Sequence, residues 1–201
     1  MPRVSKRRQQ KNTVAIVGDG QTERIYFADV QDTDRPANLS IFPDYPRKIG
    51  NYKGVLGRAI SLIGNYSRIY ALIDIDKIIH DNQQAAYAND KAAAVAEGII
   101  VLENNPCFEI WLLLHFIHTG KLFANCNEVS DQLRANGRIP NYDKTEKFLK
   151  NARLFKTYKH LLIERAIPNA KLLENNRAGQ DQLYPRAETF RFFEWYLENG
   201  K

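Results

Sequence analysis

The sequence predicts an α/β protein with a mostly parallel sheet, flanking helices and a helical C-terminal elaboration. Short apolar runs alternate with helical periodicities up to about residue 105, and only helical patterns follow. Two of the apolar runs end in acidic residues, as buried strands do when their carboxyl ends meet at a site. We therefore expect a basic flexible leader over 1–12, an α/β core over 13–105, and a helical elaboration over 106–201 packed on the same core.

Each expected element rests on a local pattern. The run TVAIV at 13–17 is rich in β-formers and leads into Gly18 and Gly20, and Thr22 is the expected N-cap of the helix that follows. The run RIYALIDID is typical of a buried parallel strand. The expected strands are 13–17, 39–43, 68–76 and 99–104, and the expected helices are 22–31, 53–65, 83–98, 106–120, 128–137, 145–167 and 186–200.

The net charge of +6 does not by itself indicate nucleic-acid binding. Five basic residues and no acid fall within the first eleven positions, which leaves 24 basic and 23 acidic residues in the rest of the chain. A basic leader of this kind is typical either of a solubilising segment or of a phosphate-binding arm. The charge of the folded part is therefore close to neutral.

Cys107 and Cys126 are too few for a disulfide framework, and their spacing to His115 and His118 lacks the CxxC or short HxxxH core of a zinc site. The longest apolar run, residues 110–117, is far shorter than the roughly 20 residues that a membrane span needs. We expect a reduced, cytoplasmic protein with no contact to a membrane.

The first turn, VGDGQTE, superficially resembles a phosphate-binding loop. The dinucleotide fingerprint requires a third glycine where this chain has Glu23, and a carboxylate there would repel a pyrophosphate. The Gly-Lys-Ser/Thr of a P-loop is also missing. Nucleotide binding is therefore not the first interpretation.

Acidic residues follow two strands that are expected to end at the same edge of the sheet: Asp19, Glu23, Asp74 and Asp76. Carboxylates that converge repel one another, and a hard divalent cation such as Mg²⁺ or Mn²⁺ relieves that repulsion. The alternative is that GDG is only a turn, Glu23 a helix-start acid and DID a loop start. Because both motifs follow buried strands, we favour a metal site.

Further candidates flank these acids. Glu109, near the start of the 106–120 helix, is a candidate fifth metal ligand at the same edge of the sheet. Alternatively, it is only an acid that the helix N-terminus stabilises. Lys77 follows the acids and is a candidate electrostatic helper in catalysis. His115 is a candidate base, although a histidine among leucines is more often a half-buried core residue.

A band of basic residues recurs at every third position from 144 to 159. On a continuous helix an i+3 series drifts around the axis, so neighbouring members form patches and not one face. The band is either a solvated helix face or a surface that follows a nucleic-acid backbone. The candidate nucleic-acid contacts are Lys147, Lys150, Arg153, Lys156 and Lys159.

An acid-bearing glycine turn after the first strand and Asp-x-Asp after a later strand resemble the Toprim domain of topoisomerases, primases and OLD-type nucleases. The segments VGDGQTERIYF, ALIDIDK, NNPCFEIWLLLHF and YPRAETFRFFEW are, more specifically, similar to the RloB family of bacterial phage-defence and restriction-linked proteins, over about Val14 to Tyr196. The resemblance implies an abortive-infection role and a separately encoded ATPase partner from the same locus.

One departure from the family pattern bears on catalysis. The family usually has Glu-Gly in the first turn, and this chain has Asp19-Gly20. The Toprim glutamate is assigned a general acid/base or metal-binding role, so the shorter Asp19 favours metal binding over proton transfer. Two hypotheses follow: a Mg²⁺-dependent nuclease acting on nucleic-acid phosphodiesters, or a catalytically silent Toprim-like scaffold or sensor that binds nucleic acid or an ATPase.

Overall fold

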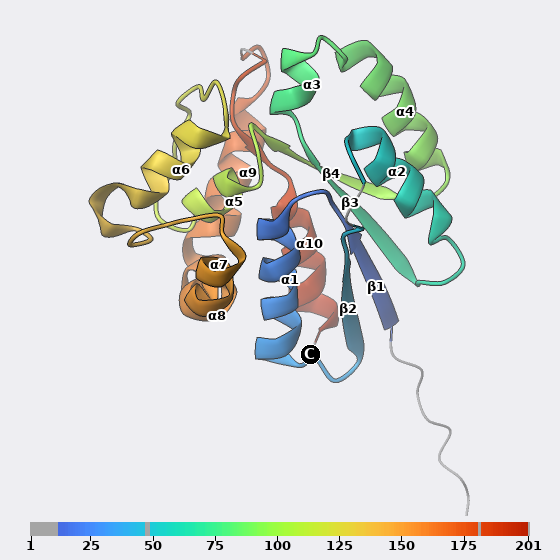
Figure 1. Ribbon diagram of the computed structural model, residues 1–201, viewed down its shortest axis with the longest axis horizontal. Helices are drawn as coiled ribbons and strands as arrows, with labels where there is room; N and C mark the ends of the chain where they lie inside the picture. Colours follow the sequence, from blue (N-terminus) through green and yellow to red (C-terminus); the bar gives the residue numbers. More distant parts are fainter. Residues whose placement is uncertain (1–11, 47–48, 181, 201) are drawn as a thin grey trace, which may run out of the picture.

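The computed structural model describes residues 12–46, 49–180 and 182–200 and has an α/β, Rossmann-like fold (Figure 1). The expected leader lies outside the described residues except for Asn12, which opens β1. The five strands among the described residues are β1 (Asn12–Val17), β2 (Leu39–Asp44), β3 (Arg68–Asp74), β4 (Ile100–Asn105) and β5 (Arg186–Ala187). They are ordered β2-β1-β3-β4-β5, and all neighbours are parallel except β4 and β5.

Helices cover both faces of the sheet, and each face has its own apolar core (Figure 1). Alternation along β1 sends Val14 and Ile16 to one core and Ala15 and Val17 to the other, which is why this central strand is apolar over 14–17. On one face lie α2 (Tyr52–Ser61), α3 (Asp76–His80) and α4 (Gln84–Ala96). The other face is covered by α1 (Gln21–Asp34), α5 (Glu109–Leu113) and α10 (Thr189–Asn199).

The remaining helices extend the second face. They are α6 (Cys126–Arg134), η1 (Ala135–Gly137), α7 (Glu146–Ala152), α8 (Leu154–Tyr158), η2 (Leu162–Ala166) and α9 (Ile167–Asn176). Aromatic side chains dominate the core there: Trp111 stacks on Phe193, with ring centroids 5.3 Å apart, and both are fully buried. Such burial of large rings gives this layer much of its stability.

Three predictions for the second half of the chain were wrong, the first of which is the helix expected over 106–120, which forms only over Glu109–Leu113. The expectation of helices alone fails at β5, whose two residues pair antiparallel with the end of β4. The single helix expected over 145–167 is interrupted at Arg153, which takes a left-handed conformation with φ 45° between α7 and α8. The guanidinium of Arg153 bonds there to the buried carboxylate of Asp29 in α1, so a tertiary contact determines the break.

No helix within the described residues is long and apolar enough to cross a membrane.

Candidate metal centre at the carboxyl edge of the sheet

A pocket of about 270 Å³ opens where the central strands β1 and β3 end. Three of the predicted acids line it: Asp19 from the turn after β1, Asp74 at the end of β3, and Asp76 at the start of α3. Parallel strands place their carboxyl ends at one edge, which brings these residues together from segments about 55 positions apart in the sequence. Asp76 begins a helix and does not continue the strand, so helix geometry, and not strand alternation, positions it.

Glu23 lies directly behind the pocket, under Gly20. A Cβ built on Gly20 would meet the Glu23 carboxylate at 2.0 Å, so the glycine leaves the space that the acid fills. Burial first, and then the charges of Glu109 and Asp19, raises the pKa of Glu23 from 4.5 to about 8. Without a cation beside it, this carboxyl group is therefore mostly protonated at neutral pH.

The aspartates of β3 and α3 show the same electrostatic signature. Burial, followed by the charges of Glu23 and Glu109, raises the pKa of Asp74 well above its usual value of 3.8. Burial also raises the pKa of Asp76, although the amide of Lys77 partly offsets it by donating to Asp76 Oδ1 over 2.7 Å. Negative charge on this cluster is costly unless a cation is present.

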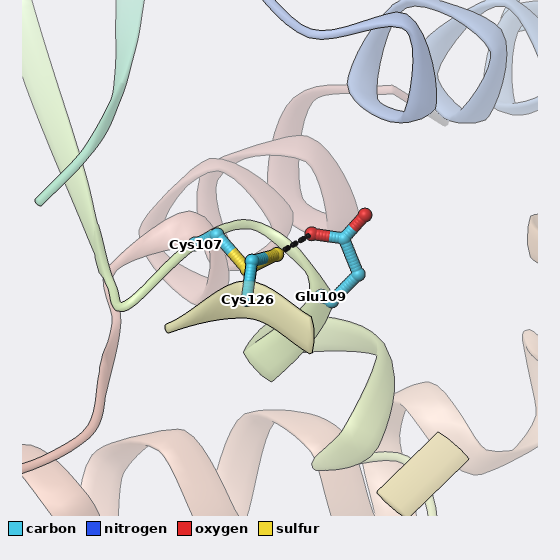
Figure 2. A group of neighbouring side chains, drawn as sticks. All are labelled: Cys107, Glu109 and Cys126. Carbon is cyan, nitrogen blue, oxygen red and sulfur yellow. Dashed lines mark hydrogen bonds between the residues drawn. A yellow bond between two sulfur atoms is a disulfide. The ribbon is translucent and has the colours of Figure 1, made fainter. Parts of the chain in front are cut away.

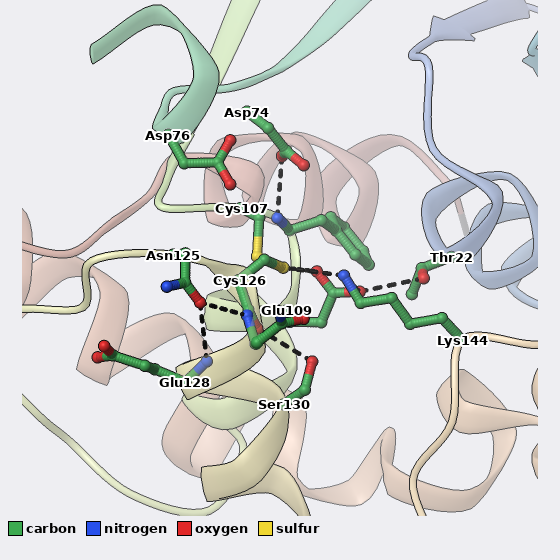
Figure 3. Close-up of a disulfide and its surroundings, with 12 residues drawn as sticks. Thr22, Asp74, Asp76, Cys107, Glu109, Asn125, Cys126, Glu128, Ser130 and Lys144 are labelled. Carbon is green, nitrogen blue, oxygen red and sulfur yellow. Dashed lines mark hydrogen bonds and ion pairs between the residues drawn. A yellow bond between two sulfur atoms is a disulfide. The ribbon is translucent and has the colours of Figure 1, made fainter. Parts of the chain in front are cut away.

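The loop after β4 holds Asp74 and Asp76 in place (Figure 3). The amide of Phe108 donates to Asp74 Oδ1 over 2.9 Å. The carbonyl oxygen of Pro106 accepts the amides of Ile75 and Asp76 over 3.1 and 3.0 Å. The acids at the end of β3 therefore depend on residues 106–108 for their position.

Glu109 lies beside the pocket but does not line it. Its Oε1 accepts hydrogen bonds from the hydroxyls of Thr22 and Tyr142 over 3.1 and 3.0 Å, and Lys144 Nζ lies 2.9 Å from the same oxygen. Thr22 was expected as an N-cap, but α1 begins at Gln21 and the hydroxyl serves Glu109. Lys144 lines the pocket, so Glu109 contributes to the site through this lysine.

Cys107 and Cys126 form a disulfide, with Cα atoms 5.7 Å apart, which the expectation of two free thiols did not include (Figure 2). Both cysteines line the pocket. Cys107, Glu109 and Cys126 are also close enough to form a three-ligand metal group, with ligand atoms within 4.8 Å of one another. Since the sulfurs are bonded to each other, they cannot act as thiolate ligands in this state.

Tyr45, in the loop after β2, lies at the site but was not predicted as a site residue. Its ring covers Gly18, where an added Cβ would meet it at 2.5 Å. Its hydroxyl is buried and has no hydrogen-bond partner among the described residues. Burial and then the charges of Glu23, Asp74 and Asp19 raise its pKa well above 10. A lone tyrosine in an irregular loop gives no sequence signal, because its role depends on where the loop folds back.

The two candidate catalytic residues that are not acids, Lys77 and His115, lie in different environments. Lys77 is exposed and lines the pocket. His115 is buried in the core, where its Nδ1 lies 3.0 Å from the carbonyl oxygen of Trp111 and its ring packs edge-on against Trp111. Burial lowers its pKa to about 4. The structure therefore does not bring His115 to the acids.

Salt bridges within the fold occupy much of the basic band. Arg153 binds Asp29, Lys159 binds Asp34 and Lys150 binds Glu146. The first two contacts attach the segment from Arg153 to Lys159 to α1, and the third lies within α7. The ammonium groups of Lys147 and Lys156 make no ion pair within the described part of the chain. These two lysines are therefore the members of the basic band that are free to bind a phosphate.

Comparison with known proteins identifies one family. A family model described as RloB-like protein matches residues 14–192, which covers both the core and most of the helical elaboration. No curated protein and no solved structure is significantly similar to the chain.

Proposed function

The chain belongs to the RloB-like family, and we propose that it is a Toprim-type, Mg²⁺- or Mn²⁺-dependent nuclease that cleaves nucleic-acid phosphodiesters at the acidic pocket. The observation that carries this proposal is the placement of Asp19, Asp74 and Asp76 in one pocket at the carboxyl ends of adjacent parallel strands, with Lys77 and Lys144 beside them. In the proposed biological setting, the protein acts in the cytoplasm in phage defence by abortive infection, with an ATPase encoded at the same locus.

The residues present fit a hard divalent cation. Every candidate ligand is a carboxylate oxygen, which is the donor type that Mg²⁺ and Mn²⁺ prefer. The raised pKa values of Glu23, Asp74 and Asp76 mean that the site is short of positive charge when empty. Asp19, Asp74 and Asp76 would hold the ion, and Glu23 would complete the set once its proton leaves.

A cation bound there would supply Lewis-acid stabilisation of charge on a phosphodiester. Lys77, exposed at the pocket wall, binds the phosphate next to the scissile bond. Lys144 shares its charge between Glu109 and the pocket, so it holds one edge of the substrate while remaining anchored. Asp19 is exposed in its turn, so it would hold the ion at the edge of the pocket that is open to solvent, and its short side chain suits this role better than proton transfer.

A specific observation favours the alternative, a catalytically silent scaffold that binds nucleic acid or an ATPase. Arg153, Lys159 and Lys150 are engaged in salt bridges within the fold, which reduces the charge available to hold a nucleic-acid backbone. Asp19 is also one methylene shorter than the glutamate expected in a Toprim turn. A scaffold of this kind would bind Mg²⁺ but release no product.

A cleavage assay distinguishes the two functions. Wild-type protein with Mg²⁺ or Mn²⁺ is incubated with plasmid, single-stranded DNA and bulk tRNA, beside Asp74→Asn/Asp76→Asn and the exposed control Asp32→Asn. The nuclease proposal predicts cleavage of at least one substrate by the wild type and the control, and loss of cleavage in the double variant with its fold intact by circular dichroism. Cleavage that survives in the double variant would refute the assignment of the site. If the wild type binds metal but does not cleave, restoration of cleavage by Asp19→Glu would trace the defect to the shorter side chain.

A further inference from the structure

We propose that Cys107 and Cys126 are a reversible thiol–disulfide pair whose oxidation state controls the affinity of the acidic pocket for divalent cations. The control of metal affinity rests on the function proposed above, whereas the reversibility of the pair stands on the cysteines alone. The chain contains only these two cysteines, so any thiol chemistry of the protein is confined to this position.

The cysteines connect directly to the residues that hold the acids. Cys107 lies between Pro106, whose carbonyl accepts the amides of Ile75 and Asp76, and Phe108, whose amide binds Asp74. A constraint on Cys107 therefore fixes the loop that positions both aspartates. Figure 3 shows this loop between the disulfide and the two acids.

Cys126 anchors the other end of the disulfide. It is the first residue of α6, whose N-cap Asn125 accepts the amides of Asn127 and Glu128. Its sulfur lies 2.8 Å from Glu109 Oε2 and 2.9 Å from Lys144 Nζ. In the disulfide this sulfur has no proton to donate to Glu109, and a thiol formed by reduction would have one. Reduction thus changes the contacts of a carboxylate that is paired with a pocket lysine.

The surrounding core does not depend on the bond. Phe108, Ile110 and Trp111 are fully buried on either side of Glu109 and hold α5 by apolar packing. The disulfide can therefore open while the helix stays in place. In a reducing compartment, bonds of this kind are usually transient and serve as redox sensors.

The reaction is an exchange with an external dithiol. One thiolate of the dithiol attacks Cys126, whose side chain is the more exposed of the two, and forms a mixed disulfide while the Cys107 sulfur leaves and takes up a proton. The second thiol of the reagent then displaces Cys126 and closes the reagent's own disulfide. Two electrons and two protons pass from the dithiol to the protein, and the reverse exchange with an oxidised dithiol restores the bond.

The structure also gives the direction of the effect. With the disulfide closed, residues 106–108 hold Asp74 and Asp76 in the positions that line the pocket. Opening it gives Pro106 and Cys107 more freedom, while Phe108 stays packed in the core, and weakens the two bonds by which the Pro106 carbonyl holds the amides of Ile75 and Asp76. Loss of an outer-shell partner lowers metal affinity by about 10-fold to 100-fold. We therefore expect the oxidised protein to bind Mg²⁺ about tenfold more tightly than the reduced protein.

The first experiment tests reversibility. Folded full-length protein is incubated with reduced or oxidised dithiothreitol, freed of the reagent, then unfolded in guanidinium and alkylated with a maleimide, and its mass is measured by mass spectrometry. The proposal predicts two labels after reduction and none after reoxidation, over repeated cycles and with an unchanged far-ultraviolet circular dichroism spectrum. Two labels under every condition, or none under native reducing conditions, would overturn it.

The second experiment tests control of the pocket. Mg²⁺ titrations compare the oxidised protein, the reduced protein after the dithiol is removed under nitrogen, and Cys107→Ser/Cys126→Ser as a matched control. The serine variant is expected to bind like the reduced wild type and to ignore the dithiol. Equal Mg²⁺ affinity in the two redox states of the wild type would refute the coupling.

Hydrogen exchange at the amides of Ile75 and Asp76, measured without metal, separates failure of the redox control from failure of the metal site. Faster exchange on reduction, with no Mg²⁺ binding in either state, would rule out the proposed metal site but support redox control of the loop. Unchanged exchange would overturn that control even if Mg²⁺ binds.

Discussion

Replacing Glu23 with glutamine should change how the stability of the metal-free protein depends on pH. The carboxyl group is buried under Gly20, and its pKa rises from 4.5 in an ordinary setting to about 8 in the fold. Between these two pH values the folded protein keeps a proton that the unfolded chain releases, so the free energy of unfolding falls as pH rises. Glutamine keeps the shape and the hydrogen-bonding oxygen but has no proton to lose.

The magnitude follows from the size of the pKa change. A rise from 4.5 to about 8 corresponds to about 5 kcal/mol of stability in total, at roughly 1.4 kcal/mol per pKa unit, of which about 3.5 kcal/mol is lost between pH 5 and pH 8. This figure is an upper bound, because the charges of Glu109 and Asp19 contribute to it and readjust when Glu23 is replaced.

The assay is guanidinium denaturation of wild type, Glu23→Gln and the exposed control Glu97→Gln at pH 5 and pH 8 in a chelator. The wild type and the control are expected to lose up to about 3.5 kcal/mol more than Glu23→Gln over this range. Saturating Mg²⁺ should restore most of the wild-type loss, since a cation that binds only the folded state stabilises it. The same pH dependence in all three proteins would refute the electrostatic account of the site.

Three further predictions test the residues around the site. Because burial lowers the pKa of His115 to about 4, the free energy of unfolding should fall by about 3 kcal/mol as pH drops from 6.5 through 4. His115→Gln should flatten this fall without changing the affinity for Mg²⁺. An altered affinity would show that His115 contributes to the metal site. Arg153→Ala should cost about 3 kcal/mol by leaving Asp29 buried without its partner, while Lys147→Ala should leave stability unchanged and reduce the salt slope of nucleic-acid binding by about one in fluorescence anisotropy; the opposite assignment of effects would refute this division of the band. Gly20→Ala places a Cβ 2.0 Å from the glutamate carboxylate and should weaken Mg²⁺ binding about tenfold by calorimetry, and a normal affinity would show that this carboxylate is dispensable.

The fold could be predicted from the sequence because the strands and helices of the α/β core each have a recognisable local pattern. Each central strand is a short apolar run, and the intervening helices have their own periodicity, so the alternation alone indicates a parallel sheet. Strand β5 was missed because two residues are too few to produce a pattern. The break at Arg153 was missed because a contact with Asp29, distant in sequence, overrides the helical preference of its neighbours.

The candidate site was predictable to the extent that it lies at strand ends. Asp19, Asp74 and Asp76 follow strands whose carboxyl ends necessarily meet, so their convergence could be inferred from the chain. Tyr45 and the Cys107–Cys126 bond could not be inferred, because loop paths bring them to the pocket and no residue spacing records such paths. Lys144 was expected in the basic band, and its contact with Glu109 became visible only in three dimensions.

The most direct test of the central claim is a calorimetric titration of Mg²⁺ into chelator-treated wild-type protein and into Asp74→Asn/Asp76→Asn, with Asp32→Asn as the exposed control. A metal centre at the ends of β1 and β3 predicts saturable binding by the wild type and the control, and an affinity lowered at least about tenfold in the double variant. Equal binding by all three proteins, or no binding by the wild type, would contradict a metal centre in this pocket.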